Sequence, residues 1–302
     1  MSGRATSDCP TLDELAAKIR DVFPELDFSK AELIVTGDDN LVVVLDGERI
    51  AGFPRNEEYR GCLAAELNLL SKLGPISPLP VPRYECVSPD RSFGVYKRIK
   101  GREMTPEVFS AMAPSDQKIA LTLFAEFLST LHSLPAETIA QPDGSIARTW
   151  SGEQFTVLYR RERRVEIASI ISAKTLARFD AFHDAFETVE PWPARLAHID
   201  LTDDPISVLG SQIAGIIDFS DAAFGDPASD FAWFWRLGEA HVERLLGEYS
   251  LAADDPMLKT RSHWRFVRYM INQLWYGLDD KWNSSTEQWL AELEPHLNRL
   301  GF

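Results

Sequence analysis

Residues 197–234 read AHIDLTDDPISVLGSQIAGIIDFSDAAFGDPASDFAWF, and their pattern gives the clearest indication of the fold. Two apolar runs, ISVL and QIAGII, flank Gly210 and Ser211, a two-residue loop with glycine first, as a type II′ β-hairpin prefers. A hairpin returns the chain to its starting point, so Asp200 before it and Asp218 after it are predicted to lie at the same end. Two carboxylates on loops at one end of a rigid hairpin indicate a chemical site.

The chain on the N-terminal side of this hairpin begins with short β-rich runs. Residues 33–36, 41–46 and 49–53 are apolar or β-branched and are separated by turn residues, which predicts an antiparallel meander. A stripe of leucines at helical spacing follows in residues 63–73, with Glu66 just off the stripe. This part is therefore predicted to be a small sheet with one helix.

From about Gly101 the pattern becomes helical. Apolar residues recur at helical spacing through residues 120–131, and residues 155–190 and 239–300 are also mostly helical in pattern. The predicted fold class is α+β and bilobal, with a small antiparallel-sheet N-terminal lobe in residues 1–99 and a larger, mainly helical C-terminal lobe in residues 100–302.

The composition and charge of the chain argue against several classes of protein. The 302 residues include 31 Lys and Arg against 46 Asp and Glu, a formal net charge of −15, which disfavours nucleic acid as a partner and favours cationic ligands. No apolar run approaches the length of about 20 residues that a membrane span needs. The N-terminus lacks the apolar core of a signal peptide, and three widely spaced cysteines indicate neither a zinc site nor a disulfide framework. We expect a cytoplasmic protein with no nucleic-acid or membrane partner.

Several familiar motifs are absent, including GxxxxGK[ST], GxGxxG, GxSxG and HExxH. The run at residues 197–234 resembles the signature of the aminoglycoside phosphotransferase family, a branch of the protein-kinase-like fold. The family pattern is close to HGDL, a hairpin, IIDFGDA and GDPAxDLA. The resemblance extends over nearly the whole chain, through the turn at residues 37–40, the FPR run at residues 53–55, LSTLHSLP at residues 128–135 and QLWYGLDD at residues 273–280.

The resemblance implies a role for each matching residue. Asp200 would be the catalytic carboxylate that accepts or orients the proton of the acceptor hydroxyl, and Asp218 would bind Mg²⁺. Glu66 would anchor a lysine on the third strand, while Asp226 and Asp230 would brace the catalytic loop. Asn40 would lie in the turn over the nucleotide, and residues 96–99, with Tyr96 and Arg98, would form the hinge beside its base.

The resemblance implies that the protein is a small-molecule O-phosphotransferase. The N-terminal lobe would bind the nucleotide, and the C-terminal lobe would carry the catalytic loop and the acceptor site. ATP or GTP would be the phosphate donor, with Mg²⁺ as cofactor. The acceptor would be a small hydroxylated molecule, either a cationic aminoglycoside or a macrolide, homoserine, choline-like alcohol or other metabolite. An aminoglycoside acceptor would imply antibiotic resistance.

Two positions depart from the family pattern. The basic residue expected two positions before Pro54 is Gly52, and the second metal ligand expected five positions after Asp200 is Pro205. Asp203 or Asp204 could replace the metal ligand, and Arg49 or Arg55 could reach the phosphates. The alternative function is therefore a pseudokinase that binds a nucleotide or a partner without transferring phosphate.

Overall fold

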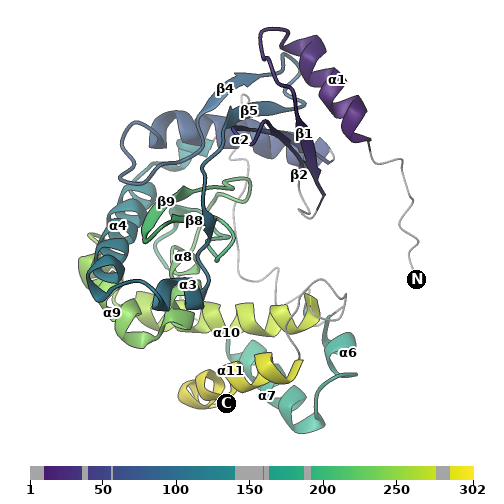
Figure 1. Ribbon diagram of the computed structural model, residues 1–302. Coiled ribbons are helices and arrows are strands. Elements are labelled where there is room, and N and C mark those ends of the chain that lie inside the picture. Colours follow the sequence, from purple (N-terminus) through teal and green to yellow (C-terminus); the bar gives the residue numbers. More distant parts are fainter. Residues whose placement is uncertain are drawn as a thin grey trace.

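The computed structural model describes residues 10–35, 40–55, 57–139, 159, 163–186, 192–276 and 286–302. An antiparallel sheet lies at one end of the molecule and a larger, mainly helical part at the other (Figure 1), which confirms the predicted fold class. The lobe boundary between residues 99 and 100 stays a prediction. Residues 37–39 of the nucleotide turn and residues 277–280 of the QLWYGLDD run lie outside the described residues.

The N-terminal sheet has five strands in the order β1-β2-β3-β5-β4, and every pair is antiparallel. Its strands are β1 Ala31–Ile34, β2 Asn40–Leu45, β3 Arg49–Pro54, β4 Tyr84–Val87 and β5 Gly94–Lys97. Helix α1, Leu12–Val22, packs against it and closes a separate core that includes Ile19, Val43 and Phe93. The capping box between Thr11 and Glu14 fixes where α1 begins.

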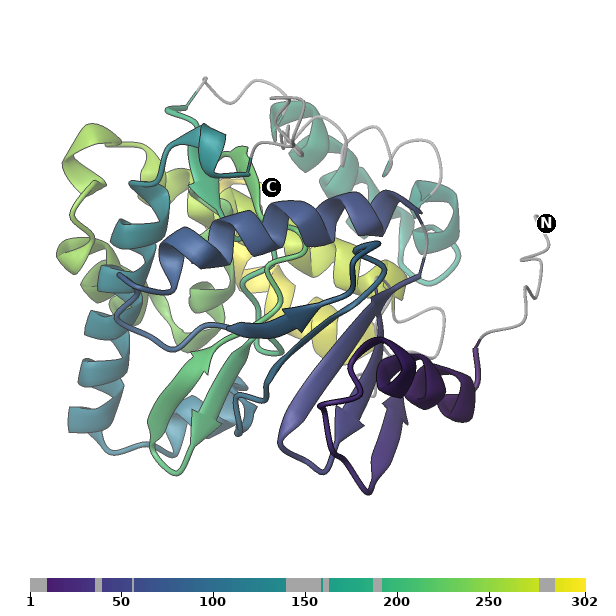
Figure 2. The same cartoon turned by 90° about the horizontal axis from the view of Figure 1, so that it is seen from above.

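Helix α2, Glu57–Leu73, lies between the sheet and the helical part (Figure 2). Its buried residues Leu69, Leu70 and Leu73 belong to the large core of the helical part. Glu66 lies on the same buried side with only 9% of its surface exposed. The helix therefore carries a carboxylate into the region where the two parts meet.

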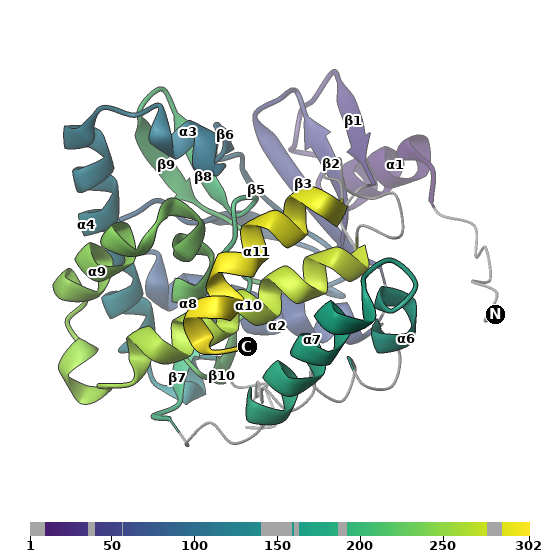
Figure 3. The same cartoon turned by 90° about the horizontal axis from the view of Figure 1, so that it is seen from below.

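The helical part is built around two long helices, α4 Pro114–His132 and α10 Leu258–Tyr276. Helix α11, Thr286–Leu300, runs beside α10 (Figure 3). Other helical segments of the described residues are α3 Pro106–Ser110, η1 Ala136–Ile139, α6 Arg164–Ile167, α7 Ala173–Phe186, α8 Ser229–Ala232, η3 Trp233–Leu237, α9 Glu239–Glu248 and η4 Ala252–Asp254. No helix in the described part of the chain is both long and apolar enough to cross a membrane.

The predicted hairpin is present. Strands β8, Ile206–Leu209, and β9, Gln212–Ile216, pair antiparallel around Gly210, whose φ of +65° suits a glycine. Strand β6, Arg102–Glu103, pairs with β8, while β7, Arg195–Ala197, pairs with β10, Ala223–Gly225. The hairpin meets the segment before β4, where the N–H of Ile216 donates to the Pro80 carbonyl at 2.9 Å.

Candidate active site

The loop that carries Asp200 is held by a buried carboxylate. Asp230, in the first turn of α8, accepts the backbone N–H of His198 and that of Ile199, each at 2.7 Å. Ile199 has a φ of +74°, a conformation that costs energy for a β-branched residue and persists only where the surroundings impose it. Asp230 imposes it and leaves the next side chain, Asp200, exposed at the surface of the loop.

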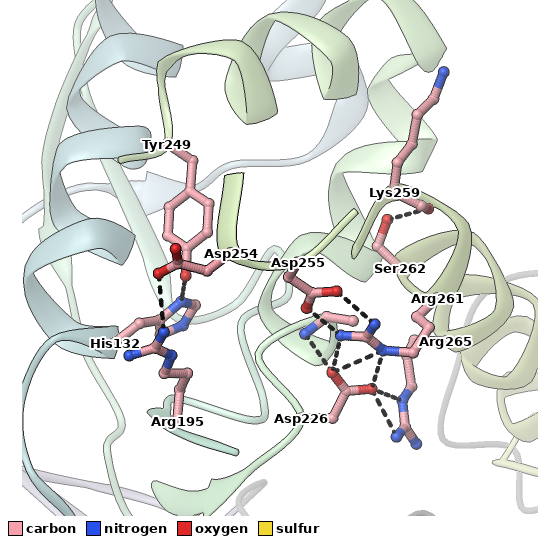
Figure 4. A network of polar contacts seen from close by, with 11 residues as sticks. His132, Arg195, Asp226, Tyr249, Asp254, Asp255, Lys259, Arg261, Ser262 and Arg265 are labelled. Carbon is pink, nitrogen blue, oxygen red and sulfur yellow. Dashed lines mark hydrogen bonds and ion pairs between the residues drawn. The ribbon is translucent and has the colours of Figure 1, made fainter. Parts of the chain in front are cut away.

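A histidine fixes Asp230 in turn. Nε2 of His132, at the end of α4, lies 3.0 Å from Asp230 Oδ2. Its Nδ1 lies 2.8 Å from the Tyr249 hydroxyl, as Figure 4 shows. Because an ionised carboxylate only accepts hydrogen bonds, Nε2 of His132 carries a proton. All three side chains are buried, so the contacts connect α4, α8 and the chain after α9 to the loop that carries Asp200.

The Asp218 segment is attached to the same loop through Ile217. His198 Nε2 lies 3.1 Å from the Ile217 carbonyl, and the N–H of Ile217 donates to the Pro205 carbonyl at 2.9 Å. Asp218 follows with a φ of +62°, and its exposed carboxylate accepts the Ser220 hydroxyl at 2.8 Å. The structure thus brings the segments of Asp200 and Asp218 together at one end of the hairpin, as the sequence predicts.

Glu66 has partners other than a lysine. It accepts hydrogen bonds from the Tyr84 hydroxyl and from the backbone N–H of Phe219, the residue after Asp218. Burial, and then the charge of Asp218, raise the pKa of Glu66 to about 8, although these hydrogen bonds lower it. Glu66 therefore ties α2 directly to the Asp218 segment.

Two facing glycines lie beside Tyr84, whose hydroxyl donates to Glu66. Gly52 on β3 is opposite Gly94 on β5, and a Cβ on Gly94 would lie 2.5 Å from the Tyr84 ring. A Cβ at Gly52, where the family pattern has a basic residue, would meet no atom within 4 Å. Tyr84 thus uses the space above Gly94, next to an open position at Gly52.

The other residues predicted to bind nucleotide lie along the sheet. Tyr96 packs edge-to-face against Tyr84, with ring centroids 5.1 Å apart, and burial and the charges of Glu66 and Asp218 raise its pKa. Asn40 is opposite Pro54 at one end of β3, whereas Arg98 follows the strand pair at the other end and donates its N–H to the Glu48 carbonyl at 2.8 Å. Glu66 and Tyr96 are therefore near Asp218, and Asn40 and Arg98 are apart from each other.

The two arginines considered for the phosphates have other contacts. Arg49 Nε lies 2.6 Å from Glu85 Oε2, and Arg55 donates to the Val35 carbonyl at 2.7 Å.

Asp226 differs from the expectation, because its described hydrogen bonds and ion pairs do not go to the loop of Asp200. It pairs with Arg261 and Arg265 of α10 at 3.1 and 2.9 Å and caps the backbone N–H of Ala228 (Figure 4). Burial would raise the pKa of Asp226, but these two guanidinium groups hold it below its usual value.

On the side of the helical part, the loop of Asp200 lies near residues that the sequence analysis did not identify. Arg236 of η3 lies 3.9 Å from Asp203 and 2.9 Å from Glu292 of α11. Burial raises the pKa of Tyr269 on α10, and the charges of Asp203, Asp200 and Asp204 raise it further. Neither residue belongs to a recognisable motif, and both come from elements far along the chain.

The donor chemistry of this end of the hairpin suits a hard cation. Carboxylate oxygens are the ligands that Mg²⁺ prefers, and Mg²⁺ commonly takes only one or two of them together with phosphate oxygens and water. Among the described residues, no three His, Cys, Asp or Glu side chains gather as a metal site of their own. A site that shares its ion with a phosphate ligand fits both observations.

The model of the phosphotransferase enzyme family matches residues 30–270, and the chain belongs to that family. This match confirms the family and the enzyme class predicted from the sequence.

Solved structures of similar fold include two classes of antibiotic phosphotransferase. The GDP complex of wild-type aminoglycoside 2'-phosphotransferase-IIIa has a TM-score of 0.74 at 19% identity, over 96% of this chain and 98% of the other. The streptomycin–ATP ternary complex of APH(2")-IIa has a TM-score of 0.65 at 17% identity, over 88% and 90%. The macrolide 2'-phosphotransferase MphH from Brachybacterium faecium, an apoenzyme, has a TM-score of 0.60 at 20% identity, over 94% and 97%.

Proposed function

We propose that this phosphotransferase moves the terminal phosphate of ATP or GTP to a hydroxyl group of a small acceptor. The observation that carries the proposal is the double hydrogen bonding of Ile217, which attaches the Asp218 segment to the Asp200 loop. Phosphoryl transfer needs one carboxylate at the acceptor hydroxyl and another at the metal that accompanies the phosphates. The GDP and ATP complexes of similar folds support a nucleotide as the donor.

Asp200 is the proposed catalytic residue. Its carboxylate accepts a hydrogen bond from the acceptor hydroxyl and takes the proton as that oxygen attacks the terminal phosphorus. The bond from phosphorus to the bridging oxygen breaks, and the nucleoside diphosphate leaves with the electron pair. The rigid loop geometry imposed by Asp230 keeps Asp200 in place, which is the main contribution of a protein to this chemistry.

Asp218 is the proposed Mg²⁺ ligand. A Mg²⁺ ion bound there would supply positive charge to the phosphate oxygens. The Ser220 hydroxyl and the Glu66 contact to Phe219 orient the segment. The proposed nucleotide site runs along β3 from Asn40 to Arg98, with Tyr96 between them, in the N-terminal lobe of residues 1–99.

The acceptor site is proposed to lie in the lobe of residues 100–302, beside Asp200. Asp203 and Asp204 follow Asp200 on the same loop, and Glu103 of β6 acts electrostatically on Asp204. This acidic surrounding favours a cationic hydroxylated acceptor of the aminoglycoside type. Antibiotic resistance is the physiological role that such an acceptor would imply, while the cytoplasmic location stays a prediction.

The second candidate function is a pseudokinase. It is favoured by Gly52, which lacks the charge that would steady the phosphates, and by Glu66, whose described hydrogen-bond donors are a tyrosine and a backbone amide. The two functions differ in whether a phosphorylated product forms.

The test is product formation by the full chain with ATP or GTP, Mg²⁺ and a panel of acceptors: kanamycin, a macrolide and a simple amino alcohol. Mass spectrometry detects the phosphorylated acceptor, and nucleotide binding is followed by thermal shift. The enzyme function predicts product with at least one acceptor. Mg²⁺·nucleotide binding with no product from any acceptor would support the pseudokinase.

A further inference from the structure

The loop that carries Asp200 is held by different residues on its two sides. Before Asp200, the carboxylate of Asp230 accepts two backbone N–H groups of the loop. After Asp200, the chain turns at Asp203, whose carbonyl accepts the N–H of Ile206 at 3.2 Å. A side chain of η3 reaches this second side, because Arg236 Nη1 lies 3.9 Å from Asp203 Oδ2.

Arg236 is itself fixed by α11. Its Nε lies 2.9 Å from Glu292 Oε1, and its Nη2 lies 3.4 Å from Glu292 Oε2, a two-point contact that sets the orientation of the guanidinium plane. The guanidinium carbon also lies 5.1 Å from the centroid of the Trp289 ring. Only 17% of the Arg236 side chain is exposed. The guanidinium group is therefore a fixed charge beside the turn at Asp203.

The segment that follows the catalytic position is strongly acidic. Asp200, Asp203 and Asp204 place three carboxylates within five residues. Burial and then the charge of Asp203 raise the pKa of Tyr269 on α10, and the charge of Arg236 lowers it. Asp200 and Asp204 also act on Tyr269 and raise its pKa. Arg236 thus supplies positive charge to a segment whose carboxylates repel one another.

We propose that Arg236 is a positioning residue for Asp200, which acts through Asp203 and holds the second side of the loop against η3 and α11. The inference rests on the proposed function, because it concerns the placement of the proposed catalytic carboxylate. Without the guanidinium group, the half-buried carboxylate of Asp203 would be left among like charges, which favours its movement toward water. A displacement of about 1 Å at a reacting group can lower a rate about a hundredfold.

The first experiment is a double-mutant cycle on phosphate transfer. Arg236→Gln should lower kcat about tenfold or more, with nucleotide affinity within about twofold of the wild type. Arg236→Lys, which keeps the charge, should recover part of the rate. In an Asp203→Asn background, Arg236→Gln should have little further effect. Arg299→Gln removes the same charge from an exposed ion pair with Glu239 and is the control, with an expected wild-type kcat.

The second experiment separates positioning from general stability by residue-resolved amide hydrogen exchange. In Arg236→Gln the N–H of Ile206, which donates to the carbonyl at the second side of the loop, should exchange faster. The N–H groups of His198 and Ile199 on the first side should keep their wild-type exchange rates. Equal acceleration of all three would indicate a general loss of stability and would overturn the positioning role.

The outcomes distinguish this inference from the proposed function. A wild-type protein that forms no phosphorylated product would overturn both. Product from the wild type, with an equal kcat for Arg236→Gln, would overturn the role of Arg236 and leave the function intact. An equal loss of rate in the wild-type and Asp203→Asn backgrounds would show that Arg236 does not act through Asp203. Melting temperatures identify a variant that fails to fold, and Glu292→Gln, which releases Arg236 from α11, should then lower kcat in the same direction.

Discussion

The carboxylate of Asp230 accepts the backbone N–H of Ile199 at 2.7 Å and holds that residue at a φ of +74°. The same carboxylate accepts the N–H of His198. The Asp230 side chain thereby fixes the backbone conformation of the loop directly before Asp200. Replacing one of its two carboxylate oxygens should therefore affect both stability and catalysis.

Asp230→Asn tests this relationship. The amide can accept one of the two N–H groups, which leaves the other donor buried, at a cost of about 1–3 kcal/mol in the free energy of unfolding. We also expect a lower kcat with little change in nucleotide affinity, because the loop carries Asp200, the proposed catalytic residue. Urea unfolding and steady-state kinetics measure the two effects. Asp221→Asn, on the segment after Asp218, is the control, and an Asp230→Asn variant with wild-type stability and kcat would contradict the account.

Glu66 should make the stability of the protein depend on pH. Its folded-state pKa of about 8 lies above the ordinary value of 4.5, so between these values the folded state keeps a proton that the unfolded state has released. The contribution of Glu66 is therefore fully present below pH 4.5 and is lost as the pH rises through about 8.

Glu66→Gln, which cannot ionise, should flatten that dependence. Thermal unfolding at intervals from pH 5 to pH 8.5 should give a difference between the variant and the wild type that shifts in favour of the variant as the pH rises. A difference that does not change with pH would show that Glu66 titrates normally.

Gly94→Ala and Gly52→Ala form a matched pair on facing strands. A Cβ at Gly94 would lie 2.5 Å from the Tyr84 ring, whereas a Cβ at Gly52 would meet no atom within 4 Å. Gly94→Ala should lower the free energy of unfolding by about 1–3 kcal/mol through overpacking. Gly52→Ala should change it by no more than about 0.5 kcal/mol. Equal effects in chemical denaturation would mean that Tyr84 does not occupy the space above Gly94.

Gly52→Lys should strengthen nucleotide binding. A Cβ at this position would meet no atom within 4 Å. A lysine there would supply the positive charge that steadies the nucleotide phosphates in this class of reaction. Isothermal titration with Mg²⁺·ATP and Mg²⁺·GTP should give about tenfold tighter binding, and Gly52→Met, of similar length without charge, should not. Binding that is already tight in the wild type and unchanged by Gly52→Lys would show that other residues steady the phosphates.

Local patterns predicted the elements that stand close together in the sequence. The Gly210 turn predicted the hairpin, and the hairpin predicted that the segments of Asp200 and Asp218 meet. Helix α1 was missed, although the spacing of Thr11 and Glu14 is a capping box that can be read directly.

Contacts between distant residues could not be predicted in the same way. His132 and Asp230 are 98 positions apart, and their contact depends on how α4 packs against α8. Tyr84 reaches Glu66 because Gly94 leaves space for its ring, a relation that no local pattern contains. Asp226 lies in a motif expected to brace the loop of Asp200, but Arg261 and Arg265, about one turn apart on α10, pair with its carboxylate instead.

Asp200 is the residue through which the chain is proposed to transfer phosphate. Asp200→Asn removes the proton acceptor and keeps the shape of the side chain, so it separates binding from chemistry. Asp21→Asn, an exposed carboxylate of α1, is the control.

The decisive measurement is the rate of phosphorylated acceptor formation, by mass spectrometry, for the wild type and both variants at saturating Mg²⁺·nucleotide. We expect product from the wild type and Asp21→Asn, and at least about a hundredfold lower rate from Asp200→Asn with unchanged nucleotide affinity. Product formation by Asp200→Asn at the wild-type rate would contradict a catalytic role for Asp200.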